Sequence, residues 1–204
     1  DMKKVLQRKR NMVDGLVAFH LDRYKATGTE LIMGAARIVA PLTVEVSLNG
    51  GGTRTLVAEK LFLNLGTRAS VPPVPGFAAA QPLTNIEALE LDRVPGHLIV
   101  LGGGYVGLEF AQAYRRFGSQ VSILDHGPRL AKREDPDVSD EIQRILEAEG
   151  IEVVLSAEVE RVEGKSGGHL RVPVHTPDGE RVIEGTDILV ATGRTPNTDG
   201  IGLE

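Results

Sequence analysis

Apolar and polar residues alternate with two different periods along the chain. Over residues 2–26, apolar side chains recur every three or four positions, which predicts one long helix. Short alternating runs follow over 30–66, including a hairpin pattern over 43–60 with a glycine-rich turn at 49–52. Residues 61–65 are mostly apolar and are followed by a glycine, which predicts a buried strand.

Strands and helices alternate beyond a proline-rich connection at about 71–95. The pattern predicts strands over 97–101, 121–124 and 151–155, a helix over 105–117, and a second helix from Asp135-Pro136 to Gly150. This order implies a parallel sheet with right-handed crossovers. An antiparallel meander is expected next, with strands over 159–162, 170–174 and 181–183, before a last buried strand over 187–191.

Composition and charge narrow the class of protein. The hydrophobic fraction of 41% and the charged fraction of 25% are those of a soluble globular protein. The net charge of 23 − 28 = −5 gives no electrostatic reason to expect a nucleic-acid partner. No apolar run approaches the roughly 20 residues of a membrane span, so no membrane partner is expected either. The chain has no cysteine, which excludes disulfides and thiolate metal sites within it and fits a cytoplasmic location; no metal site is predicted.

A glycine-rich turn between an expected strand and an expected helix carries the first chemical signal. The pattern G-x-G-x-x-G is met by Gly102, Gly103, Gly104, Tyr105, Val106 and Gly107. In a strand–turn–helix context, the first glycine permits the tight turn, the second lets a pyrophosphate approach the backbone, and the last lets the helix pack on the strand. A pyrophosphate would then lie at the helix N-terminus, where free N–H groups favour an anion. The alternative is a turn with no ligand.

An acidic residue follows at the distance that a dinucleotide site requires. Asp125 ends the second strand, 125 − 102 = 23 residues after the first glycine, where a carboxylate accepts hydrogen bonds from the adenosine ribose. A free ribose diol suits a carboxylate, so NAD is favoured over NADP. NADP remains open, because His126, Arg129, Lys132 and Arg133 could meet its extra phosphate. The alternative is that Asp125 faces solvent and binds no ligand.

Residues 102–109 read GGGYVGLE and resemble the central nucleotide-binding motif of the flavin-dependent pyridine nucleotide–disulfide oxidoreductases. Three further segments agree in order and spacing: LNLGTRASVPPVPG at 63–76, LAKREDP at 130–136 and ILVATGRTPN at 188–197. They resemble the first ATG strand of that family, the segment before its second nucleotide-domain helix and its second ATG strand. The resemblance covers the whole chain and is closest to the mercuric reductase-like and dihydrolipoamide dehydrogenase-like branch.

The resemblance implies the fold class and the domain organisation. It implies an α/β chain with a Rossmann-like NAD(P)-binding domain, made of a parallel sheet and an antiparallel meander, and part of an FAD-binding domain. Residues 1–85 would be the end of the first FAD-domain segment, 86–190 the NAD(P)-binding domain and 191–204 the return to the FAD domain. The flavin-binding glycine loop, the redox cysteines and the dimerisation domain of such enzymes would lie outside this internal fragment, which is expected to be inactive by itself. The full-length protein would hold FAD and form a homodimer.

The resemblance also assigns roles to individual residues. Tyr105 takes the position of the side chain that covers the nicotinamide face of the flavin and swings aside, and Glu109 that of a carboxylate beside the nicotinamide. Without such a role, Tyr105 would be an aromatic residue packed at a helix start, and Glu109 would be an exposed glutamate favoured by the helix dipole. Thr192 and Gly193, together with Gly66 and Thr67, would border the cofactors through the backbone. The first ATG motif departs from the family, since it reads Asn64-Leu65-Gly66 without a threonine.

The leading functional hypothesis is hydride transfer from NAD(P)H to flavin and on to a disulfide or another small-molecule acceptor. This middle region is shared by disulfide, mercuric ion, quinone and oxygen reductases, so the acceptor stays open. A non-catalytic NAD-binding regulatory module is the alternative, although it would not need the 30–66 region or the 188–197 return. A methyltransferase also uses a glycine loop and an acidic strand end, but no substrate motif follows the third strand.

Overall fold

The computed structural model describes residues 1–203, which form two compact units. The larger unit holds residues 1–7 and 69–194, and the second holds residues 8–68 and the segment from Thr195 onward. Within the described residues, no helix combines the length and the apolar character that crossing a membrane requires.

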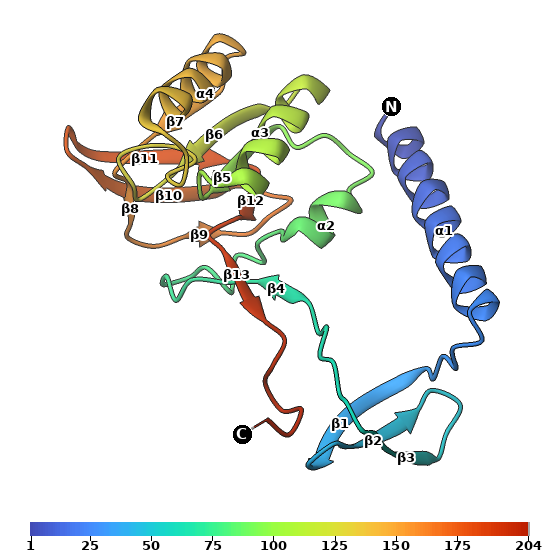
Figure 1. The fold of residues 1–204 in the computed structure, drawn as a ribbon. Helices are drawn as coiled ribbons and strands as arrows, with labels where there is room; N and C mark the ends of the chain where they lie inside the picture. The colour runs from blue at the N-terminus through green and yellow to red at the C-terminus, as the bar shows by residue number, and fades with distance from the viewer. Residues whose placement is uncertain (204) are drawn as a thin grey trace. The chain divides into compact units, whose positions relative to one another are not determined.

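The larger unit is built on a four-stranded parallel sheet, in the order β12-β5-β6-β7 (Figure 1). Its strands are β5 (His97–Leu101), β6 (Gln120–Leu124), β7 (Glu152–Val154) and β12 (Asp187–Val190). Helix α3 (Tyr105–Phe117) connects β5 to β6, and α4 (Pro136–Ala148) connects β6 to β7. The predicted α/β class with a parallel sheet is therefore confirmed. The bounds predicted for β5 and α3 are also those observed.

The two faces of this sheet are covered differently, because side chains alternate along each strand. Leu98 and Val100 of β5 belong to a core cluster that includes Ala111 and Tyr114 of α3. Ile99, the residue between them, packs in a second cluster with residues of a meander on the other face. Side chains on both faces of β5 are thus buried among apolar residues, which is why β5 reads as a continuous hydrophobic run.

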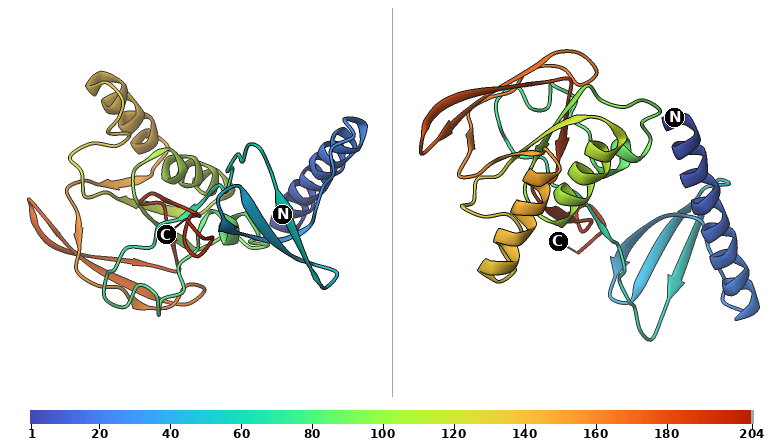
Figure 2. Two further views of the ribbon diagram at one scale, coloured as in Figure 1. Left: turned by 60° about the horizontal axis from the view of Figure 1, so that its bottom comes forward. Right: turned by 90° about the horizontal axis from the view of Figure 1, so that it is seen from above.

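The antiparallel meander lies between β7 and β12 in the sequence. It contains β8 (Glu158–Val159), β9 (Glu163–Gly164), β10 (Leu170–Thr176) and β11 (Gly179–Gly185). The long β10–β11 hairpin is recognisable in orange and red in Figures 1 and 2. The strand predicted over 159–162 exists as β8, but its predicted extent is wrong, since β8 ends at Val159. The buried Val162 instead donates its N–H to the Pro75 carbonyl at 2.9 Å, so its apolar character reflects packing against the connection rather than a strand.

The connection before β5 contains a short helix that the sequence analysis missed, α2 (Asn85–Leu89). Thr84 caps it: the Ile86 N–H donates to Thr84 Oγ1 at 3.1 Å, and the Thr84 N–H donates to Glu87 Oε2 at 2.8 Å. This Thr-x-x-Glu capping box was the available sequence signal. Buried Ala88 anchors the helix, and its carbonyl accepts the hydroxyl of Tyr114.

The second unit contains most of α1 (Met2–Ala26), as predicted, and a sheet of β1 (Gly34–Ala40), β2 (Thr43–Leu48) and β3 (Thr53–Val57). The three strands are antiparallel in sequence order. Strands β4 (Thr67–Ala69) and β13 (Arg194–Pro196) pair where the chain passes from one unit to the other.

The buried strand predicted over 61–65 is wrong. These residues are in no strand, and Phe62 is 87% exposed. The carbonyl of Leu65 accepts a hydrogen bond from the side-chain amide of Asn197 rather than from a strand backbone. The apolar run has no strand partner within residues 1–203, and an apolar run without a partner cannot be a buried strand.

A buried ion pair fixes the start of β12. The carboxylate of Asp187, which is 0% exposed, accepts two hydrogen bonds from Arg93 Nη2 and Nη1 at 2.6 and 2.9 Å, and a third from Thr186 Oγ1 at 2.9 Å. The bond to Asp187 raises the pKa of Arg93. Bidentate geometry of this kind is the strong form of an ion pair.

We therefore expect Asp187→Ala to lower the free energy of unfolding by about 2 kcal/mol, because it removes the acceptor of the Arg93 and Thr186 donors. The loss is smaller than for a fully buried pair, because water can solvate the partly exposed Arg93. Urea denaturation measures this change. Glu141→Ala, which breaks the exposed Glu141–Arg144 pair, is the control and should change stability little. Equal effects of the two substitutions would contradict the role given to Asp187.

Candidate functional site

The turn between β5 and α3 has a geometry that only glycine can adopt. Gly102 has φ +111° and donates its N–H to the Leu124 carbonyl at 2.8 Å. A Cβ atom at Gly102 would lie 2.5 Å from the Ala191 carbonyl oxygen. The first glycine of the loop is therefore required by the backbone itself.

The last and the middle glycine of the loop have opposite surroundings. A Cβ atom at Gly107 would lie 2.1 Å from the Gly102 carbonyl oxygen, so the absence of a side chain lets α3 pack directly on the turn. Gly104 has an ordinary negative φ of −83°, and a Cβ there would meet nothing within 4 Å. Gly104 therefore keeps a space open rather than relieving strain.

The N-terminus of α3 borders this open space. Gly104 is the N-cap residue, no side chain caps the helix, and no acidic residue lies in its first turn. The first N–H groups of a helix have no intrahelical acceptor, and they carry the positive end of the helix dipole. An uncapped helix start beside an open glycine is an arrangement suited to a phosphate group.

Asp125 directly follows β6 and lies beside the glycine loop. Its carboxylate accepts the N–H groups of Gly103 at 2.5 Å and Gly127 at 2.6 Å, and its side chain is 12% exposed. His126 Nδ1 lies 3.8 Å from the same carboxylate. A carboxylate has about four acceptor positions, so Asp125 retains capacity for hydroxyl donors from a ligand.

A basic segment, residues 126–134, follows Asp125 and is fixed to the glycine loop. Leu130 is fully buried, and the Ala131 N–H donates to the Gly103 carbonyl at 2.8 Å. The segment carries four basic side chains that line the cavity described below: His126, Arg129, Lys132 and Arg133. Arg129 pairs with Asp140 at 3.6 Å, whereas Lys132 and Arg133 form no ion pair with the rest of the described chain. Two unpaired cations are therefore available to an anion.

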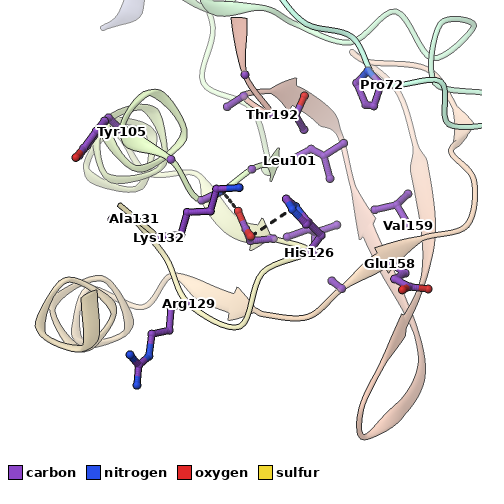
Figure 3. Close-up of a pocket in the computed structure, with 18 of the residues that line it drawn as sticks. Pro72, Leu101, Tyr105, His126, Arg129, Ala131, Lys132, Glu158, Val159 and Thr192 are labelled. Carbon is purple, nitrogen blue, oxygen red and sulfur yellow. Dashed lines mark hydrogen bonds and ion pairs between the residues drawn. The ribbon is translucent and has the colours of Figure 1, made fainter. Parts of the chain in front are cut away.

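These parts surround a cavity of about 410 Å³. Its walls are the glycine loop, the end of β6, the basic segment, the start of the meander and residues 191–193 (Figure 3). Its volume lies in the range of small-molecule sites. The cavity lies at the carboxyl ends of parallel strands, where open α/β sheets bind ligands.

The structure brings most of the predicted site residues together. Those that line the cavity are Gly102, Gly103, Gly104, Tyr105, Asp125, His126, Lys132, Thr192 and Gly193. Val106 and Gly107 lie in the first turn of α3 behind the loop, and Glu109 is exposed one turn beyond Tyr105. Gly66 and Thr67 belong to the second unit and do not line this cavity.

Several lining residues were missed by the sequence analysis. Ala157 and Val159 follow β7 and line the cavity, and the Ala157 N–H donates to the Asp125 carbonyl at 2.9 Å. Their position after the third parallel strand was the available signal. Pro72 and Val74 come from the proline-rich connection, whose sequence carries no comparable signal.

Tyr105 lies on the rim of the cavity and is 54% exposed. Its ring points away from the centre of the cavity (Figure 3), and its hydroxyl donates to the carboxylate of Glu134. This hydrogen bond is the main cause of a raised pKa of Tyr105, to which burial and the charge of Glu134 add and which Arg133 opposes. Glu134 was not among the predicted site residues.

Comparison with known proteins gives relatives along the whole chain. The mercuric reductase of Streptomyces lividans is 37% identical over 205 residues, which cover 100% of this chain and 43% of that protein. The probable pyridine nucleotide-disulfide oxidoreductase RclA of Escherichia coli is 33% identical over 207 residues, covering 100% of this chain and 45% of that protein. The chain thus spans less than half the length of these relatives.

The fold is also found in solved structures. The Cu(II) complex of the HOCl-induced flavoprotein disulfide reductase RclA from Escherichia coli superposes with a TM-score of 0.85 at 32% sequence identity, covering 98% of this chain and 45% of that one. Residues 4–204 match the family described as pyridine nucleotide-disulphide oxidoreductase. The expected resemblance is confirmed: the chain belongs to the pyridine nucleotide-disulphide oxidoreductase family.

Proposed function

We propose that this chain binds NAD(P)H for an FAD-dependent oxidoreductase and prefers NADH. The observation that carries the proposal is the open space at Gly104, which adjoins an uncapped helix start and the Asp125 carboxylate. The pyrophosphate would accept the free N–H groups of α3, and the ribose hydroxyls would donate to Asp125. Membership of the family supports the same assignment.

The dinucleotide supplies the hydride when bound, and the chain positions it. The N–H groups at the start of α3 would offset the negative charge of the pyrophosphate, and Asp125 would fix the orientation of the adenosine end. Tyr105 and Glu109, one helical turn apart, would border the nicotinamide end. In the longer protein, FAD would accept the electrons, and Gly66, Thr67 and Gly193 would contact it through the backbone.

The terminal acceptor that we propose is a disulfide or another small-molecule oxidant. Relatives of this chain include proteins named glutathione reductase and mercuric reductase, so the same nucleotide domain serves different acceptors. These 204 residues contain no cysteine, so any redox cysteine pair would belong to another part of the longer protein. We propose a homodimer for that protein.

The role of Gly104 is tested by filling the space beside it. Gly104→Ala should weaken NADH binding, and Gly104→Val should weaken it by at least about 30-fold, or about 2 kcal/mol, because the side chain would lie where the pyrophosphate binds. Isothermal titration calorimetry measures the affinity. Both variants should remain folded with at most a modest loss of melting temperature, because a Cβ atom at this position meets no protein atom within 4 Å and the cost is that of a poorer N-cap residue.

The matched control is Gly107→Ala, whose added carbon meets the Gly102 carbonyl and should lower the melting temperature instead. Unchanged NADH affinity in a folded Gly104→Val protein would refute this position for the pyrophosphate.

Cofactor preference is tested at Asp125. The carboxylate accepts two hydrogen bonds from the ribose diol of NADH, but it would repel the 2′-phosphate of NADPH by about 1–3 kcal/mol, or roughly 5- to 150-fold in affinity. We expect NADH to bind at least about 5-fold more tightly than NADPH, and Asp125→Ala to narrow the gap, mainly by improving NADPH binding. Fluorescence titration with both nucleotides measures the ratio.

The control is Lys132→Ala, which should weaken NADPH binding more than NADH binding, because it removes an unpaired cation from the cavity wall. Melting temperatures are recorded in parallel, since Asp125 also accepts the Gly103 and Gly127 N–H groups. Tighter binding of NADPH by the unmodified chain would show that the basic segment dominates and that the preference is for NADP.

A further inference from the structure

The contact between Tyr105 and Glu134 joins two segments of the cavity rim. Tyr105 is the first residue of α3, and Glu134 lies 29 residues later at the end of the basic segment. The hydroxyl donates to the carboxylate, while the ring points away from the cavity (Figure 3). The contact therefore fixes the direction of the tyrosine side chain in the cavity lining.

The Tyr105 ring is only partly covered by the rest of the described chain. It is 54% exposed, and no aromatic or cationic side chain among residues 1–203 stacks on it. The neighbouring position, Gly104, has no side chain and adjoins open space. A tyrosine side chain occupies a few staggered rotamers. Without the hydroxyl contact, the ring would exchange among them and would also populate rotamers directed over the cavity.

Glu134, in contrast, is presented by a fixed backbone. Its N–H donates to the Ala131 carbonyl at 2.8 Å, and the Ala131 N–H donates to Gly103 at 2.8 Å. The adjoining Leu130 is fully buried, and Asp135 is the N-cap residue of α4. The carboxylate that accepts the Tyr105 hydroxyl is thus tied to the same glycine loop that forms the candidate pyrophosphate site.

We propose that Glu134 is a positioning residue that holds the Tyr105 ring off the cavity and so keeps the site open to the dinucleotide. This inference rests on the proposed nucleotide-binding function. When only a fraction of the molecules has an open site, the apparent dissociation constant rises by the inverse of that fraction. A carboxylate that binds no nucleotide atom can therefore raise nucleotide affinity.

The sign of the effect separates this role from simple electrostatics. Glu134 is an anion near a site for an anionic ligand, so charge alone predicts that its removal tightens NADH binding. A positioning role predicts that its removal weakens binding, because the ring is released. Tyr105→Phe isolates the second effect, since it removes the hydroxyl without changing the charge or the ring.

The experiment is a set of NADH titrations on the 204-residue chain and its variants. We expect Tyr105→Phe and Glu134→Ala each to raise the dissociation constant roughly 3- to 10-fold, and Glu134→Gln, which keeps an acceptor oxygen, to raise it less. In the Tyr105→Ala background, where there is no ring to hold, Glu134→Ala should cause no further weakening. Melting temperatures establish that each variant is folded.

A spectroscopic measurement reports the contact independently of the nucleotide. The chain has three tyrosines and no tryptophan. The tyrosinate absorbance measured against pH therefore reports only three ionisations. Burial raises the pKa of Tyr114 to about 12, which keeps its ionisation at the alkaline end. Glu134→Ala and Glu134→Gln should move one tyrosine ionisation to lower pH, because the acceptor that raises the pKa of Tyr105 is removed or weakened. Tyr105→Phe should abolish that step.

The proposal is overturned if Glu134→Ala tightens NADH binding, if it weakens binding equally in the Tyr105→Ala background, or if the tyrosine titration does not move. In these cases the unmodified chain still binds NADH, so the proposed function stands while the positioning role falls. Absence of NADH binding by the unmodified chain would instead remove the proposed function and the inference together, whatever the tyrosine titration shows.

Discussion

The close approach of α3 to the end of β5 is the constraint on which the site depends. Only the absence of a side chain at Gly107 lets the helix backbone lie against the Gly102 carbonyl, at a place where a Cβ atom would be 2.1 Å from that oxygen. This contact brings the positive end of a helix to the carboxyl edge of the sheet, next to Asp125. The end of β6, Asp125 and the basic segment are hydrogen-bonded to this turn.

In the proposed function, Asp125 would link folding and ligand recognition in one side chain. Its carboxylate accepts N–H groups from the glycine loop and from Gly127, so it holds two loops together before any ligand is present. A ribose diol would use the remaining acceptor positions of the same oxygens. A substitution of Asp125 therefore changes both the conformation of the loop and the charge of the site. The two effects are separated when stability and nucleotide affinity are measured on the same variant.

Local signals account for what could be predicted from the sequence. β5 and α3 have the expected bounds, because a continuous apolar run, three glycines and the αL glycine at Gly118 all act within a few residues. The run at 61–65 and the extent of the strand at 159–162 were predicted wrongly, since an apolar run does not specify its partner. Pro72 and Val74 of the cavity, and the Tyr105–Glu134 contact, arise from tertiary packing between distant segments and have no local pattern.

The contacts of Ser70 with residues 192 and 193 have a topological consequence. The chain leaves the parallel-sheet part of the larger unit next to where residue 69 enters it: the Ser70 N–H donates to the Gly193 carbonyl at 3.0 Å, and Thr192 Oγ1 donates to the Ser70 carbonyl at 3.0 Å. The two ends of residues 69–194 thus lie next to each other. Ends that lie together are the layout that tolerates insertion into a host chain or closure into a circle by a short linker. The core of this unit also contains Met2, so such a transfer would have to keep the start of α1 as well.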